Sequence, residues 1–210
     1  MSTSTAATMS PEQRVTTLFQ LLETSGKKEH IGGKMTQLDH ALQAAHLAKN
    51  EGADEETILA ALLVNIGQLI PPPEKSILSR YAYDSLYRLA ASTGTVSAID
   101  HGKLGAEYLR QLGFPNKTCE LVESDVMARR YLLSVDPQYV IPPLTGSVGH
   151  ISYQEKSLSP TEIREFENDP LFKQKVQLRQ WNPVLMRTAN HPPALDTYCE
   201  MAIRNLKPLV

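Results

Sequence analysis

The sequence predicts an all-α fold, a single helical bundle, on three observations. Its most apolar run, residues 58–70, places Ile58, Leu62 and Ile66 at i, i+4 and i+8, with apolar residues on nearly every side, as in a buried helix. Helix-start signals of the Ser-Pro type recur along the chain. No segment alternates polar and apolar residues convincingly enough to predict a strand.

The helices follow one another through one domain, residues 10–210, after a flexible tail of Ser, Thr and Ala at residues 1–9. Ser10, Pro11 and Gln13 form a capping box that starts the first helix. The remaining helices are predicted to cover residues 36–50, 54–70, 101–112, 116–135, a segment beginning at 159–162, 169–181 and 195–206.

The helix at residues 54–70 is the predicted core. Asp54 caps its start, and Glu55 and Glu56 suit the positive end of the helix dipole. Three prolines, residues 71–73, end it. The run is too short to span a membrane. An irregular helix and a loop are expected in the long segment that follows, residues 74–99.

Composition excludes several classes of function. The 210 residues include 21 basic and 23 acidic side chains, for a net charge of −2. This balance gives no electrostatic reason to expect nucleic acid or a charged membrane as a partner. The sequence shows no secretory or transmembrane segment, so we expect a cytoplasmic protein with a small-molecule substrate.

A resemblance begins in residues 38–69, LDHALQAAHLAKNEGADEETILAALLVNIGQL. This string resembles the opening of HD-domain proteins, and more closely the HD-domain mixed-valence di-iron oxygenases that cleave organophosphonates. Those proteins read H-D-I-G-H where this chain reads V-N-I-G-Q, beginning at Val64. The resemblance covers roughly residues 13–181, and it implies an HD-domain-like helical bundle.

The resemblance also implies which residues occupy the iron-ligand positions. His40 and His101 match two of the family's histidines. Four positions have changed. Val64 and Asn65 replace the H-D pair, and Asp125 replaces a further family histidine. Asn182 replaces the aspartate of a family R-R-W-D pattern, which reads R-Q-W-N here, beginning at Arg179. Valine cannot bind a metal, and asparagine cannot bridge two cations as a carboxylate does. We therefore expect no di-iron centre, no metal site and no cofactor.

The positions that contact substrate in the family are better preserved. A family lysine corresponds to Arg129, and the ends of a substrate-contacting loop pattern correspond to Ser147 and Gln154. A family tyrosine corresponds to His30, and the second histidine of H-D-I-G-H to Gln68. The predicted substrate-binding residues are Arg129, Asn65, Gln68, Asn182, Ser147, Gln154, His30 and Trp181.

Three functions remain open. We favour a metal-independent isomerase, cyclase or lyase of a specialised biosynthetic pathway, with His101 and Asp125 as the acid–base pair and His40 in the same pocket. The first alternative is a non-catalytic ligand-binding or accessory protein, because Val64 fills space at the centre of the pocket. The second is an oxygenase with a single metal held by His40, His101 and Asp125. Tyrosines in residues 74–99 could line the pocket or a contact in a homodimer.

Overall fold

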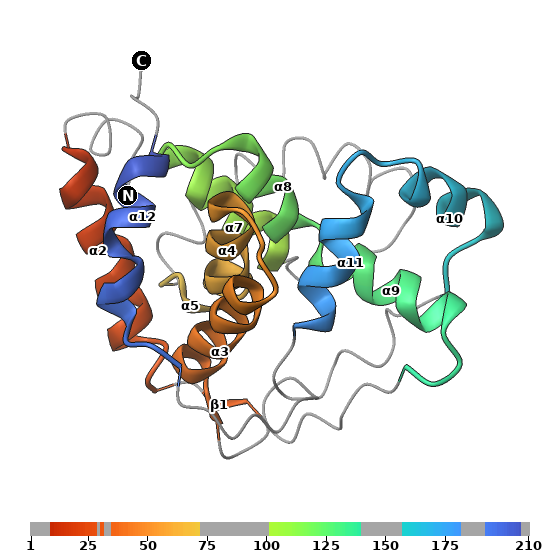
Figure 1. The fold of residues 1–210 in the computed structure, drawn as a ribbon, viewed down its shortest axis with the longest axis horizontal. Helices are drawn as coiled ribbons and strands as arrows, with labels where there is room; N and C mark the ends of the chain where they lie inside the picture. The colour runs from red at the N-terminus through yellow and green to blue at the C-terminus, as the bar shows by residue number, and fades with distance from the viewer. Residues whose placement is uncertain are drawn as a thin grey trace.

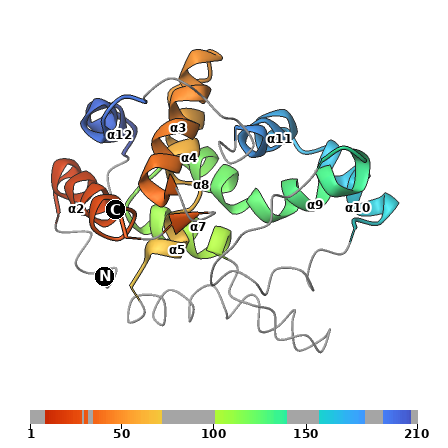
Figure 2. The ribbon, with the colours of Figure 1, turned by 90° about the horizontal axis from the view of Figure 1, so that it is seen from below.

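The described part of the chain is a bundle of helices in three groups (Figures 1 and 2). The computed structural model describes residues 9–28, 30–31, 35–71, 101–139, 157–181 and 192–206. On one side lie α2 (Pro11–Thr24), the 3-10 helix η2 (Leu195–Tyr198) and α12 (Cys199–Asn205). The centre holds α3 (Gln37–Asn50), α4 (Glu55–Leu63), α5 (Ile66–Leu69), α7 (His101–Gln111) and α8 (Asn116–Glu123). The other side holds α9 (Asp125–Val135), α10 (Pro160–Glu167) and α11 (Phe172–Gln180). The predicted all-α fold is confirmed.

The main hydrophobic core surrounds α4, which packs on α3, α8, α11 and α12. Every side chain from Thr57 to Leu63 is buried, as the apolar run predicts. A second, smaller core joins α9, α10 and α11 through three aromatic rings, Tyr131, Phe166 and Phe172, whose centroids lie 5.2 to 5.4 Å apart. Such tilted and edge-on ring pairs stabilise the contact beyond the area they bury.

The predicted helix starts are confirmed at atomic detail. The Ser10 backbone N–H donates to the Gln13 side chain at 2.9 Å, and the Gln13 N–H donates to the Ser10 hydroxyl. The same reciprocal pair joins Ser159 and Glu162 at the start of α10. Asp54 caps α4 by accepting from the Thr57 N–H at 3.0 Å. These caps satisfy N–H groups that have no partner within their own helix.

Two helices predicted as continuous are interrupted. The core helix ends at Leu63 and turns through Val64 and Asn65 before α5 begins. The helix predicted over 116–135 breaks at Ser124, whose hydroxyl donates to the Leu121 carbonyl at 2.8 Å. A serine hydroxyl that bonds nearby backbone offers the chain an alternative to the regular helix. The first of these breaks lies inside the predicted site.

The structure also adds a small pair of strands, β1 (His30–Ile31) and β2 (Met35–Thr36). They pair antiparallel, with His30 opposite Thr36. Two residues per strand are too few to produce an alternating pattern in the sequence. The predicted irregular helix in residues 74–99 and most of the predicted tail lie outside the described residues.

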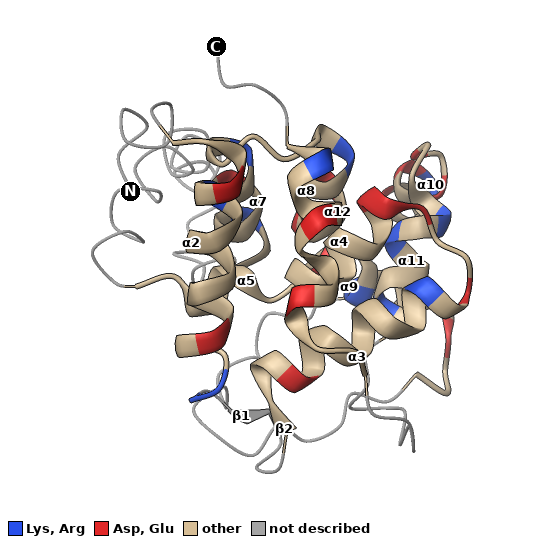
Figure 3. Cartoon of the chain, turned by 60° about the vertical axis from the view of Figure 1, so that its left-hand side comes forward, with Lys and Arg blue, Asp and Glu red and all other residues tan. Residues whose placement is uncertain are grey.

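Charged side chains of both signs are interspersed over the described helices in the view of Figure 3. Two sets of contacts that involve charged side chains connect elements far apart in the sequence. Arg204 and Asn205 on α12 donate to the Glu55 carboxylate at the start of α4, and Lys117 on α8 pairs with Asp54. Among the described helices, none combines the length and apolarity that a membrane span requires.

Candidate functional site

His40 lies on α3 at the break between α4 and α5, which is where the resemblance places the metal motif. Its side chain is only 4% exposed. Its Nδ1 atom is 3.4 Å from the amide nitrogen of Asn65, the residue that precedes α5. The histidine and the HD-motif position are therefore neighbours in space, as the sequence comparison with the family implies.

A short chain of side-chain amides continues from Asn65. The Gln68 amide nitrogen donates to the Asn65 amide oxygen at 3.4 Å. The Gln68 oxygen accepts in turn from the Gln37 amide nitrogen at 2.7 Å. Gln37 is the first residue of α3, is 7% exposed, and was not among the predicted site residues. Its position one helical turn before His40, on the same face, was the signal that could have revealed it.

Gly67 brings α7 against this break. A Cβ atom on Gly67 would lie 2.0 Å from the backbone oxygen of His101 and 2.8 Å from the Gly105 nitrogen. Only glycine permits so close an approach of the two backbones. His101 is the first residue of α7, and its side chain is exposed while its backbone is held against α5.

Asp125 is paired with Arg179, and not with His101 as the predicted acid–base pair requires. The Arg179 Nη1 atom lies 3.2 Å from the Asp125 carboxylate, and its Nε donates to the Tyr139 hydroxyl at 2.9 Å. Burial alone would lower the pKa of the Arg179 guanidinium, but the charge of Asp125 and the contact with Tyr139 raise it above its usual value. The Arg179 guanidinium therefore keeps its positive charge beside Asp125. Arg179 was missed in the sequence, although it stands in the same family string as Trp181.

The remaining described positions lie in the main core or on α9. Trp181 is 4% exposed in the main core, and its indole N–H has no hydrogen-bond partner within the described ranges. Val64 is partly buried and packs against the same core. Arg129 is half-buried on α9, one turn after Asp125. Asn182, Ser147, Gln154 and the side chain of His30 lie outside the described residues.

The donors that the structure describes do not fit a two-iron centre. No group of three His, Cys, Asp or Glu side chains within the described ranges is placed to hold a metal ion. His40 faces an amide at the position where the family has a bridging carboxylate. The Asp125 carboxylate is already bonded to a guanidinium. A second iron would have to displace that guanidinium from Asp125.

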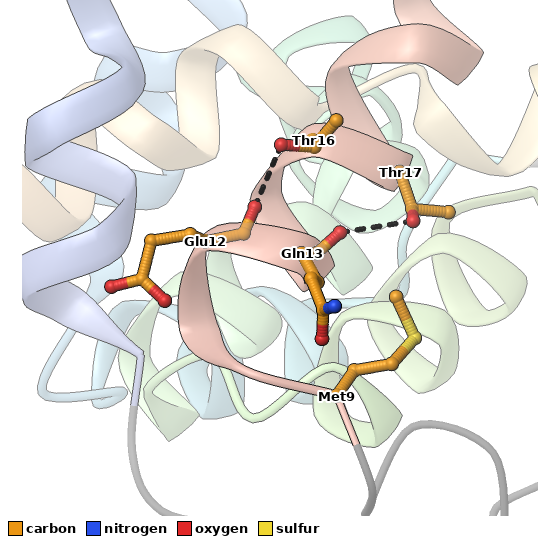
Figure 4. Close-up of a pocket in the computed structure, with 5 residues that line it drawn as sticks. All are labelled: Met9, Glu12, Gln13, Thr16 and Thr17. Atoms are coloured by element: carbon orange, nitrogen blue, oxygen red, sulfur yellow. Dashed lines mark hydrogen bonds between the residues drawn. The ribbon is translucent and has the colours of Figure 1, made fainter.

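A separate hollow of about 340 Å³ lies on the surface of α2 (Figure 4). It is lined by Met9, Glu12, Gln13, Thr16 and Thr17, none of which belongs to the predicted site. Both threonine hydroxyls donate to backbone carbonyls of their own helix, at 2.8 and 2.9 Å.

Similarity to known proteins extends over most of the chain, although no family model matches it. The chain is 34% identical over 172 residues to a hydroxymethylphosphonate dioxygenase of Gimesia maris, a match covering 82% of this chain and 78% of that protein. It is 30% identical over 159 residues to the glycine-betaine-forming [1-hydroxy-2-(trimethylamino)ethyl]phosphonate dioxygenase of Leisingera caerulea, covering 76% and 73%. An uncharacterized protein of Acanthamoeba polyphaga mimivirus is 31% identical over 194 residues, covering 92% and 82%.

These similarities overturn the favoured prediction of a metal-independent isomerase, cyclase or lyase. The two relatives with named activities are dioxygenases, and their names place an oxygenase, the second alternative drawn from the sequence, ahead of acid–base chemistry without a metal. The all-α fold and the identity to both dioxygenases over most of their length agree. The chain belongs to the HD-domain oxygenase family, which includes the phosphonate dioxygenases.

Proposed function

We propose that this protein is an oxygenase that acts on a small phosphonate or a closely related anion, with a single metal ion in place of two. The observation that carries the proposal is the similarity to two phosphonate dioxygenases over about three quarters of their length. The geometry at the motif supports it, because His40 is buried beside the motif break and Gly67 lets α7 pack closely against α5.

The reduction to one metal follows from the substituted positions. We propose that the HD motif is degenerate, because Val64 has no donor atom and the Asn65 amide is neutral. Asp125 is committed to Arg179. Among the predicted donors that the structure describes, His40 is the one buried at the motif break, so we propose it as a ligand of the single metal.

The experiment compares wild type with His40→Ala, each purified from iron-supplemented cells. We expect about one iron per wild-type chain, since the donors for two are missing, and much less in the variant. Oxygen uptake with hydroxymethylphosphonate should follow the iron content. Two irons in wild type would contradict the single-metal site, and an absence of both iron and oxygen uptake would overturn the proposal.

A non-catalytic phosphonate-binding protein is the second candidate. The amide chain from Asn65 to Gln37 favours it, because amides at a metal position suit hydrogen bonding to a ligand better than metal coordination. Phosphorus NMR distinguishes the two candidates. Binding of hydroxymethylphosphonate to iron-loaded protein under oxygen, without product, would support the binder, and product formation would exclude it.

A further inference from the structure

We propose that Gln37, Gln68 and Asn65 form an amide relay that sets which ring nitrogen of His40 carries the proton, and that Gln37 is its remote positioning residue. The relay starts at the first residue of α3, crosses to α5, and returns to α3 at His40. Gln37 therefore acts on the imidazole through two other side chains and not by contact.

The contacts run in one direction. Gln37 donates to Gln68 at 2.7 Å, and Gln68 donates to Asn65 at 3.4 Å. The Asn65 amide nitrogen then faces His40 Nδ1, also at 3.4 Å. An amide nitrogen has only hydrogens to offer, so Nδ1 must present its lone pair. A neutral His40 in this arrangement carries its proton on Nε2.

The same heavy-atom positions permit the opposite direction. An amide exposes an oxygen on one side and an NH₂ group on the other, with nearly the same shape. If all three amides turn over, Gln68 donates to the Gln37 oxygen, and Asn65 presents its oxygen to a proton on His40 Nδ1. The lone pair then lies on Nε2. The direction of the relay thus decides whether Nε2 is a hydrogen-bond donor or a basic nitrogen.

The two directions of the relay differ in which polar atom of Gln37 is paired. Its side-chain oxygen is buried and has no hydrogen-bond partner within the described residues. Leaving a buried acceptor unpaired costs about 1–3 kcal/mol. Reversal would pair that oxygen and leave the Gln37 nitrogen without its present acceptor. In either direction, one polar atom of the Gln37 amide is left without a hydrogen-bond partner among the described residues. The two directions are therefore close in free energy, and one substitution in the relay is enough to favour one of them.

Substitution by a carboxylate forces the direction. In Gln68→Glu the side chain only accepts, so it takes hydrogens from both Gln37 and Asn65. Asn65 must then turn its oxygen toward His40. We expect the His40 proton to move from Nε2 to Nδ1, although residue 68 is not hydrogen-bonded to the imidazole. If Gln68→Glu does not fold, Gln37→Glu imposes the same reversal from the far end.

Nitrogen-15 NMR of the imidazole reads the tautomer directly, in metal-free protein at about pH 8, where a histidine of ordinary pKa is neutral. Loss of signals in His40→Ala assigns the resonances. We expect Nε2–H in wild type, Nδ1–H in Gln68→Glu, and a mixture in Gln37→Met, where the relay has lost its end. Gln177→Met is the control, because Gln177 bonds Glu51 at the surface of α11 and should leave the tautomer unchanged.

An unchanged tautomer in folded Gln68→Glu or Gln37→Met would overturn the relay, as would Nδ1–H in wild type. The measurement needs no metal and no substrate, so its failure is separate from failure of the proposed oxygenase function. If both hold, iron binding at Nε2 of His40 would require the relay to reverse, because only the reversed relay leaves a lone pair there, and Gln37 would then also affect iron affinity.

Discussion

Gly67 packs directly on the backbone carbonyl of His101, with no room for a side chain between them. An added Cβ would lie 2.0 Å from that oxygen, far inside van der Waals contact. The contact fixes α5 against the first turn of α7. It therefore holds the motif break, with Asn65 and Gln68, at a fixed distance from the start of the next helix.

Gly67→Ala is expected to be strongly destabilising, because the obstacle is backbone on a packed helix and cannot rotate away. Overpacking a close-packed region costs about 1–3 kcal/mol or more. Gly52→Ala is the matched control. Gly52 has a φ of +76° and no atom within 4 Å of an added Cβ, so its cost is conformational, about 1–2 kcal/mol. Urea unfolding of both variants tests this, and a cost at Gly67 no larger than at Gly52 would contradict the packing argument.

The partly buried ion pair of Asp125 and Arg179 predicts coupling in a double-mutant cycle. The two side chains are 20% and 13% exposed. Removing one partner leaves a partly desolvated charge, so we expect a cost below the roughly 3–5 kcal/mol of a fully buried pair. We expect Asp125→Leu and Arg179→Met each to destabilise markedly, and the double variant to cost clearly less than their sum. Additive free energies of unfolding would show that the pair is not coupled.

Helix starts were the most predictable part of the fold. Ser10, Asp54 and Ser159 cap their helices by local hydrogen bonds that depend on residues three positions away, so the sequence alone contains the information. The breaks at Asn65 and Ser124 were not predicted. The first accompanies the contact of Gly67 with α7, which is distant in sequence, and the apolar pattern of residues 58–70 continues across it undisturbed.

Within the candidate site, the sequence predicted the residues that align with the family motif and missed their partners. His40 and Asn65 are neighbours, as the resemblance implies. Gln37 and Arg179 were missed, because each acts through a partner at least 31 positions away in the sequence. The isomerase prediction failed because it inferred acid–base chemistry from residue types, while the partner of Asp125 is set by how α11 packs on α9.

The lowered pKa of Asp54 predicts that the folded protein loses some stability in acid. Burial alone would raise its pKa, but hydrogen bonds from Lys117 and Thr57 outweigh burial and lower the pKa below the ordinary value of 3.8. A carboxylate whose pKa is lower in the folded state than in the unfolded state stabilises the fold at pH values above its unfolded-state pKa. This stabilisation is lost as the pH falls through the folded-state pKa. The carboxylate is half exposed, so its charge should contribute less than about 1 kcal/mol.

Asp54→Asn isolates this contribution, because asparagine caps a helix about as well as aspartate. We expect wild type to be the more stable protein above about pH 5, and the difference to shrink below about pH 4. Thermal unfolding across this range measures it. A difference that grows toward acid pH would have the opposite sign and would contradict the assignment.

Restoring the family ligands tests whether substitution alone removed the second metal. The variant combines Val64→His, Asn65→Asp, Asp125→His and Asn182→Asp, following the positions that the resemblance assigns. We expect its iron content to rise to about two per chain, because it regains two histidines and two carboxylates. Asn65→Asp should also turn His40 toward the Nδ1–H form, since a carboxylate only accepts, and so leave the Nε2 lone pair for a metal.

The matched control carries three of these changes and retains Asp125. Its carboxylate remains bonded to Arg179 at 3.2 Å, so a metal would have to displace a guanidinium to reach it. We expect this variant to bind less iron than the fourfold one. Equal iron in both would show that the ion pair with Arg179 does not block the second position. A folded fourfold variant with no more iron than wild type would show that the loss lies in the surrounding frame and not in the four ligand positions.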